Sequence, residues 1–140
     1  IITPFFEKQS DMFQHLQKSR FAVLPYKLDY IASTTFQAMY YEMPVVVYKT
    51  AGTPTLNKEK ECVLIADMEN VEQLAAKMLL LLDNQEEALV LRKNAKELVD
   101  FKNDGKRISD VVMNNFRAIV AHFRYGTPIP QELIYNPLEQ

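Results

Sequence analysis

Apolar residues gather in two short continuous runs early in the chain, at 21–25 and 44–48. Both runs are rich in β-forming residues and lack the alternation of a half-exposed strand, so we predict two buried parallel strands. The apolar residues between the two runs have helical spacing. They predict a helix over 33–42 with Ser33 or Thr34 as its N-cap, and hence a right-handed strand–helix–strand crossover.

The same pattern predicts elements on both sides of this crossover. They are the end of a strand at Ile1-Ile2, a helix over 10–19 capped by Ser10, a short strand over 62–65, amphipathic helices with apolar residues over 71–78 and 88–98, and a long last helix with apolar residues from Ile108 to Phe123. Gly126 and Pro128 should stop this last helix, and the proline-containing tail that follows is expected to be extended.

These elements predict an α/β fold, with a Rossmann-like parallel sheet flanked by helices and a helical C-terminal region. We expect one domain over 1–126 and an extended tail over 127–140. The strand that ends at Ile1-Ile2 has no natural start, so further protein is expected before it.

Composition narrows the class of protein. The 140 residues are about half apolar and one quarter charged, as in ordinary globular domains, and the formal net charge is −2. The chain lacks the excess of positive charge that binding to nucleic-acid phosphates requires, so nucleic acid is a poor candidate partner. No segment is long and apolar enough to span a bilayer, which predicts a soluble or at most peripheral protein.

Two residue types are candidates for chemistry and receive structural interpretations. Cys62 is the only cysteine, which suits a reducing compartment, and it lies in an apolar run, so we expect a buried structural thiol. His15 and His122 stand alone in predicted helices and are expected to be structural or surface residues. We find no plausible cluster of metal ligands in the sequence.

The stretch with candidate binding chemistry follows the first predicted strand. In open parallel sheets, ligands bind outside the carboxyl ends of the strands, where helix N-termini present free N–H groups to anions. Ser33, Thr34 and Thr35 place three hydroxyl groups at such a helix start, which suits a phosphate or diphosphate. The alternative is that one of them caps the helix and the others fill its first turn.

Other polar residues of this stretch allow two interpretations each. Asp29 would repel a phosphate but could accept hydrogen bonds from sugar hydroxyls, or it could make an Asx-turn. Gln37 lies one helical turn after Ser33 and could face the same ligand, or it could be solvated. Lys27 and Lys49 flank the proposed mouth and could attract a diphosphate, or they could be solvated loop residues.

The block from Val23 to Asn57 resembles the donor-site signature of the family-four retaining glycosyltransferases, which have two Rossmann-like domains. The spacing matches throughout: Asp29 stands at the family's first acidic position, Gln37-Ala38-Met39 at its Glu-Ala-Met, Met43-Pro44-Val45-Val46 at its strand entry, and Ala51-Gly52-Thr53-Pro54 at its Gly-rich loop. A weaker likeness continues to about Val120, including Leu91-Arg92-Lys93-Asn94-Ala95.

The resemblance implies the donor-binding domain of a bacterial enzyme that uses a nucleotide diphosphate sugar and no metal. It implies that Asp29 contacts the donor sugar, that Gln37 binds the ribose, and that the amides of Ser33 and Thr34 hold the diphosphate, with Gly52 in the neighbouring loop. The acceptor would be a glycan or a lipid-linked molecule in polysaccharide or lipopolysaccharide assembly. The expected location is the cytoplasm, with possible peripheral contact at the inner face of the membrane.

Three departures from the family pattern bear on activity. Asp29 replaces a glutamate and reaches one methylene less far, while Gln37 replaces the glutamate that accepts from both ribose hydroxyls. The family's diphosphate-clamping Arg and Lys, and its acceptor-binding domain, precede the region that begins at Ile1. We therefore expect this chain alone to be an incomplete and inactive enzyme.

Two functions from other classes compete with this interpretation. The first is a non-catalytic, degenerate Rossmann-like module for protein interaction or nucleotide binding, in which Gln37 marks the loss of function. The second is a phosphoacceptor signalling domain, which requires a cluster of acidic residues at a strand end that the sequence lacks.

Overall fold

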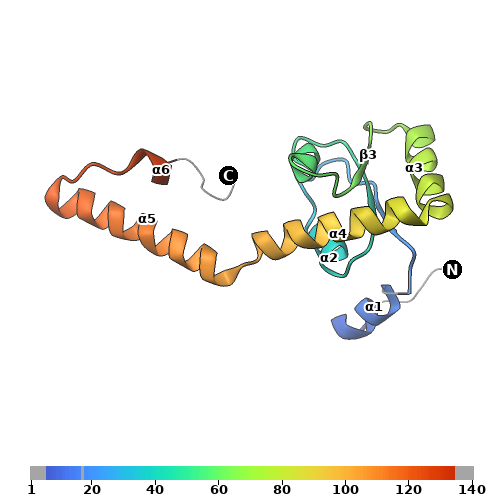
Figure 1. Ribbon diagram of the computed structural model, residues 1–140, viewed down its shortest axis with the longest axis horizontal. Helices are drawn as coiled ribbons and strands as arrows, with labels where there is room; N and C mark the ends of the chain where they lie inside the picture. The colour runs from blue at the N-terminus through green and yellow to red at the C-terminus, as the bar shows by residue number, and fades with distance from the viewer. Residues whose placement is uncertain (1–5, 17, 135–140) are drawn as a thin grey trace. The chain divides into compact units, whose positions relative to one another are not determined.

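A computed structural model of the protein describes residues 6–16 and 18–134. The chain forms two compact units, residues 1–99 and 100–140, with ten helices and strands assigned in the described part (Figure 1). These are α1 (Gln9–Leu16), β1 (Ala22–Leu24), α2 (Ser33–Tyr40), β2 (Val45–Tyr48), the 3-10 helix η1 (Thr53–Asn57), β3 (Leu64–Ala66), α3 (Val71–Asp83), α4 (Gln85–Lys102), α5 (Gly105–Tyr125) and α6 (Gln131–Ile134). The predicted strand end at Ile1-Ile2 lies outside the described residues.

The three strands form a parallel sheet in the order β1-β2-β3, which confirms the predicted α/β class. Val46 of the central strand pairs with Val23 on one side and with Leu64 on the other. All four residues of β2 are buried, as expected of a parallel strand covered on both faces. β2 therefore has no solvent-facing side chain, which explains why its sequence does not alternate.

Two apolar clusters cover the two faces of the sheet. On one face, Val45 and Val47 pack with Met39 of α2 and with Ala95 and Val99 of α4. The other cluster joins Val46 to Leu64 of β3, Leu81 of α3 and Leu91 of α4. Full burial of such side chains stabilises a fold by roughly 1.5–3 kcal/mol each, so these clusters hold the helices against the sheet.

β3 begins at Leu64, two residues later than the sequence predicts. The reason is Asn57, whose Oδ1 accepts hydrogen bonds from the backbone N–H groups of Cys62 (2.9 Å) and Val63 (3.1 Å). Its Nδ2 donates to the Val63 carbonyl at 2.8 Å. A side chain thus replaces the strand ladder at these two residues and satisfies their buried backbone groups.

The helix ends also differ in part from prediction. α1 begins at Gln9, so Ser10 lies inside its first turn and does not cap it, and the helix ends at Leu16 instead of Ser19. Ser10 donates to its neighbour Asp11 instead. By contrast, Asn70 caps α3 through a hydrogen bond from the Gln73 N–H group.

The second unit contains α5 and α6. Asp104 caps α5 by accepting from the Arg107 N–H group, and Gly126 ends it in the left-handed conformation, with φ 69°, which confirms the predicted stop. The prediction of an extended tail is wrong at 131–134, which form the short helix α6 after Pro130. Proline is well suited to a position just before a helix because its missing N–H group would have no partner there.

Glu42 has left-handed backbone geometry, with φ 57°, directly after α2. Its N–H group donates to the Met39 carbonyl, and its own carbonyl accepts from Arg92 Nε at 2.6 Å. The helix therefore ends at Tyr40, two residues before the predicted end, because the chain must reverse here to enter β2. Glycine adopts this conformation without steric cost, whereas other residues do not.

Glu42→Gly is therefore expected to raise the free energy of unfolding by about 0.5–1 kcal/mol. A left-handed residue with a Cβ costs roughly 1–2 kcal/mol, and the greater freedom of glycine in the unfolded chain offsets part of this gain. Because the Glu42 side chain is exposed, no packing is lost. Urea unfolding measures the change, and Glu42→Ala is the matched control. An equal gain in the alanine variant would show that loss of charge, and not relief of strain, is responsible.

Cys62 is buried, with 3% of its surface exposed, as predicted for a structural thiol. Its Sγ–H group donates to the Lys60 carbonyl at 3.4 Å. Burial raises the pKa of the Cys62 thiol from its ordinary value of 9.0 to about 11. The thiolate, which is the nucleophilic form, is therefore disfavoured in the folded protein.

We expect iodoacetamide to alkylate Cys62 at pH 8 about 100-fold more slowly in the folded chain than in urea, since two pKa units lower the thiolate fraction by that factor. Mass spectrometry of quenched samples gives both rates. Alkylation of the folded chain at the unfolded rate would contradict the buried thiol.

Candidate functional site

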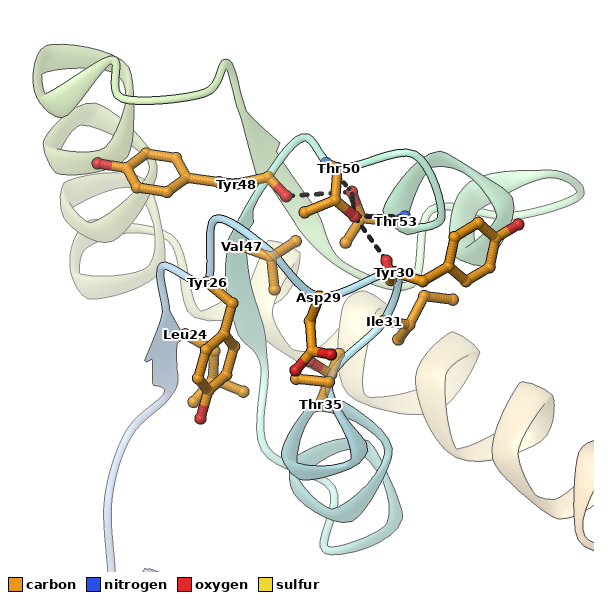
Figure 2. Close-up of a pocket in the computed structure, with 11 residues that line it drawn as sticks. Leu24, Tyr26, Asp29, Tyr30, Ile31, Thr35, Val47, Tyr48, Thr50 and Thr53 are labelled. Atoms are coloured by element: carbon orange, nitrogen blue, oxygen red, sulfur yellow. Dashed lines mark hydrogen bonds between the residues drawn. The ribbon is translucent and has the colours of Figure 1, made fainter.

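A small pocket opens at the carboxyl ends of β1 and β2, where the loops that follow these strands meet the start of α2 (Figure 2). The space that it encloses is about that of one water molecule, and it is lined by Leu24, Tyr26, Asp29, Tyr30, Ile31, Ala32, Thr35, Val47, Tyr48, Thr50 and Thr53. Typical small-molecule sites are far larger, at roughly 300–1,000 Å³. A ligand of that size would therefore lie over the mouth of the pocket and not inside it.

Thr50 joins the loop after β1 to the loop after β2, and Thr53 holds the second of these loops from within. Thr50 Oγ1 donates to the Tyr30 carbonyl at 2.6 Å and accepts from the N–H groups of Gly52 and Thr53 (Figure 2). Thr53 Oγ1 donates to the Tyr48 carbonyl at 3.0 Å and accepts from the Thr50 N–H group at 2.9 Å. These bonds fix the geometry of both loops at the pocket wall.

Gly52 is required where the two loops approach each other. A Cβ atom at this position would lie 2.5 Å from the Tyr30 carbonyl oxygen and 2.6 Å from an atom of the Tyr30 ring. Such distances are shorter than any tolerable contact with a carbon atom. The backbone of Gly52 has φ −100°, so the need for glycine here is steric and does not come from the dihedral angle.

α2 begins without a side-chain cap. Its N-cap residue is Ala32, so the prediction that Ser33 or Thr34 caps the helix is wrong. Ser33 and Thr34 instead occupy the first two helical positions, and both are exposed. Thr34 Oγ1 donates to the Tyr26 hydroxyl at 3.1 Å. An uncapped helix start leaves first-turn N–H groups for water or an anion.

Asp29 is a predicted site residue that lies in the pocket wall. It lines the pocket from the loop after β1, and Figure 2 shows its carboxylate directed toward Thr35 at the start of α2. Gly52 lies beside the same pocket, since its neighbours Thr50 and Thr53 line the wall. Asp29, the start of α2 and Gly52 therefore lie together at the carboxyl ends of β1 and β2.

Gln37 and Lys27 lie outside the pocket lining. Gln37 is half-buried, one turn after Ser33. Lys27 forms an exposed ion pair with Glu69, in the loop before α3. The hydrogen bond and the charge of Glu69 raise the pKa of Lys27, with a smaller contribution from Tyr48 in the pocket wall, and Lys27 correspondingly lowers the pKa of Glu69.

The remaining candidates for chemistry have structural surroundings. His122 Nδ1 lies 2.9 Å from the Thr127 carbonyl at the end of α5, which agrees with a structural or surface role. The structure does not describe the His15 side chain. Across residues 6–16 and 18–134, His, Cys, Asp and Glu side chains form no group of three that could hold a metal ion.

Comparison with known proteins supplies the family. A family described as "Glycosyl transferases group 1" matches residues 1–98, which include the whole parallel sheet and the pocket. The chain belongs to this family. Neither the curated proteins nor the solved structures yielded a significant match.

For this group 1 glycosyltransferase, the family establishes sugar transfer as the general activity and agrees with the Rossmann-like α/β fold. The match ends one residue before the first compact unit does, so the matched residues coincide with that unit. Within the described part of the chain, each helix is too short or too polar to cross a membrane.

Sequence reasoning missed the residues that build the pocket wall in this glycosyltransferase. Thr50 and Thr53 are absent from the predicted site, although each makes several of the bonds that shape it. The sequence feature that could have indicated them is the pair of threonines on either side of Ala51-Gly52. Tyr26 and Tyr30 also line the pocket, but tyrosines in a loop carry no specific signal for a site.

Gly52→Ala is expected to destabilise this glycosyltransferase by about 2 kcal/mol, because the added methyl group forces the loop after β1 to move. It should also perturb the amide signals of Asp29 and Tyr30 in NMR spectra. Gly105→Ala is the control, since a Cβ there meets nothing within 4 Å. This control should leave the stability unchanged or raise it slightly, as alanine favours helix. Unaltered stability of Gly52→Ala in urea unfolding would refute the close approach.

Proposed function

We propose that this chain is the donor-binding part of a family-four-like retaining glycosyltransferase. The donor is a nucleotide diphosphate sugar, and the acceptor is a glycan or a lipid-linked molecule. A separate domain binds the acceptor, as in enzymes with two Rossmann-like domains (the GT-B fold). The chain binds and orients the donor and contains no catalytic residue that we can assign. Support comes from the family, whose general activity is sugar transfer, and from the pocket at the carboxyl ends of the strands.

The observation that carries the proposal is the uncapped start of α2 beside Asp29. A diphosphate is a strong hydrogen-bond acceptor, and the first-turn N–H groups of Ser33 and Thr34 lie at the positive end of the helix dipole. When it is ionised, Asp29 accepts hydrogen bonds and cannot donate them, so it suits the hydroxyl groups of a sugar and would repel the phosphates. The two groups therefore favour opposite ends of a sugar diphosphate.

The pocket is too small to enclose either part of the proposed donor. We propose that the donor lies across its mouth, with the sugar on the side of Asp29. The nucleotide would then extend past the start of α2, along the helix side on which Gln37 follows Ser33 by one turn. Gln37 outside the pocket lining is compatible with the ribose contact that we propose for it, made through one oxygen acceptor and one N–H donor.

Lys27 has a lesser role in this proposal. Its ammonium group already pairs with Glu69, so it adds little net positive charge near a diphosphate. Exposed ion pairs are also screened by salt. We propose that the main attraction for the diphosphate comes from backbone N–H groups of α2, with clamping cations supplied from elsewhere in the enzyme and no metal required.

A single proline substitution, at Ser33, tests this proposal. Ser33 is the first residue of α2, where proline is well tolerated, and Ala32 has the extended geometry (φ −63°, ψ 136°) that a residue before proline prefers. Ser33→Pro therefore removes both the N–H group and the hydroxyl group with the helix kept. Ser33→Ala removes the hydroxyl group alone and is the matched control.

We expect uridine or guanosine diphosphate to bind the chain weakly and to shift the amide signals of 29–35 in NMR titrations. Ser33→Pro should weaken this binding about tenfold or more, because a hydrogen bond to a charged group contributes roughly 1.5–3 kcal/mol. Ser33→Ala should weaken it less. If neither diphosphate shifts these signals, the chain is better described as the non-catalytic module. Equal losses in the two variants would assign the contact to the hydroxyl group.

A further inference from the structure

The pocket wall contains three threonines, and their hydroxyl groups are used differently. Thr50 and Thr53 each donate a hydrogen bond to a backbone carbonyl and accept from at least one backbone N–H group. The hydroxyl group of Thr35 forms no hydrogen bond with any residue of 6–16 and 18–134. Thr35 is nevertheless the most enclosed of the three, with 1% of its surface exposed against 4% for Thr53.

A buried hydroxyl group without a partner destabilises a fold, because it has lost its hydrogen bonds to water and gained none in return. Valine has nearly the same shape as threonine and would fill this position without that cost. Since Thr35 lines the pocket, its side chain can be reached from there. The position therefore suits a group that binds a ligand better than a group that only packs.

Asp29 borders the same small space. Its carboxylate is directed toward Thr35 (Figure 2), but no hydrogen bond joins these two side chains. The enclosed space is about that of one water molecule, and a hydroxyl group is of similar size. Part of the remaining lining is apolar and comes from Leu24, Ile31 and Val47. The pocket thus has room for one small polar group between a carboxylate and a hydroxyl group.

Asp29 and Thr35 together select the chemistry of this group. An ionised carboxylate only accepts hydrogen bonds, whereas a threonine hydroxyl group both donates and accepts. A hydroxyl group of a ligand can therefore donate to Asp29 and accept from Thr35 at the same time. An ionised phosphate or carboxylate oxygen cannot donate, and the charge of Asp29 would repel it. The apolar part of the lining excludes water, which strengthens both hydrogen bonds.

We propose that Thr35 determines which donor sugars the chain accepts, by holding one free hydroxyl group of the sugar against Asp29 in this pocket. The inference rests on the proposed function, in which the sugar lies on the side of Asp29. It adds Thr35 to the site and a substrate class to the function, namely nucleotide sugars with an unsubstituted hydroxyl group at one defined position. A deoxy sugar would leave Asp29 and Thr35 without a partner, and an acetamido group at the same position is too large for the space.

Urea unfolding of the chain without ligand tests whether the Thr35 hydroxyl group is free. Thr35→Val should leave the unfolding midpoint unchanged or raise it, because no hydrogen bond within the chain is lost. Thr53→Val is the matched control and should lower the midpoint, because it leaves the Tyr48 carbonyl and the Thr50 N–H group unpaired. An equal loss of stability in the two variants would overturn the proposal, since the Thr35 hydroxyl group would then have a structural partner, such as a buried water molecule.

NMR titration of the 140-residue chain tests the ligand. The probes are uridine diphosphate and guanosine diphosphate, the glucose and galactose derivatives of the first, and the mannose derivative of the second. The affinity for each nucleotide sugar divided by the affinity for its own diphosphate gives the contribution of the sugar. We expect at least one sugar to increase the affinity, and we expect one of its single-deoxy analogues to bind about tenfold more weakly, because a hydrogen bond to a charged group is lost.

Thr35→Val should reduce the contribution of this sugar about fivefold and leave the affinity for the diphosphate unchanged, because one hydrogen bond to the sugar is lost. Thr35→Ser keeps the hydroxyl group and should restore the contribution. The deoxy analogue should lose less affinity in Thr35→Val than in the unaltered chain, since both changes remove the same contact. A merely structural role of Thr35 would not produce this coupling between a side chain and one position of the sugar.

The possible failures of this inference and of the proposed function differ. Binding of a diphosphate with no increase for any of the three sugars would overturn the inference and leave the diphosphate site intact. Full retention of the sugar contribution in Thr35→Val would do the same. Failure of both diphosphates to bind would instead overturn the proposed function, and this inference with it.

Discussion

The burial of β2 on both faces is the constraint on which the rest of the first unit (residues 1–99) depends. Each of its four residues is enclosed, and Val46 pairs with strands on both sides. A parallel strand in this position needs helices on both faces of the sheet, and α2, α3 and α4 supply them. Because the strands are parallel, their carboxyl ends lie at one edge of the sheet, and the loops that follow β1 and β2 must meet there.

The meeting of these loops sets the shape of the pocket. A hydrogen bond from Thr50 to the Tyr30 carbonyl and the missing side chain at Gly52 allow the backbones to approach closely. Donors and acceptors of the two loops are thereby used internally, so the wall is rigid and its geometry is already set. The start of α2 differs, because no side chain caps it. A rigid wall beside an uncapped helix start is the physical basis of the proposed donor site.

The two units use amphipathic helices in different ways. In the first unit, α4 buries Leu91, Ala95 and Val99 against the sheet. In the second unit, α5 has a similar helical repeat of apolar residues but buries none of them. The sequence pattern is equally clear in both helices, so the pattern alone cannot say whether an apolar face is covered. Only the structure shows that the apolar face of α4 is covered by the sheet.

The sequence by itself determined the elements that depend on local patterns. The buried runs at 21–25 and 44–48 predicted β1 and β2 because β-forming residues without alternation favour an enclosed parallel strand. The end of α5 at Gly126 was predictable because glycine alone adopts the left-handed conformation easily. Family resemblance through the block 23–57 also came from sequence, and the family match confirms its general activity.

Only the tertiary structure decided features that join residues far apart in the chain. Examples are the pairing of Lys27 with Glu69 and the bond from Thr50 to Tyr30. In each case a polar group had several possible partners nearby in sequence, and the packing of the sheet selected one. Local propensity sets which elements form, whereas the partner of a polar side chain depends on which loops the sheet brings together, and that is a property of the whole fold.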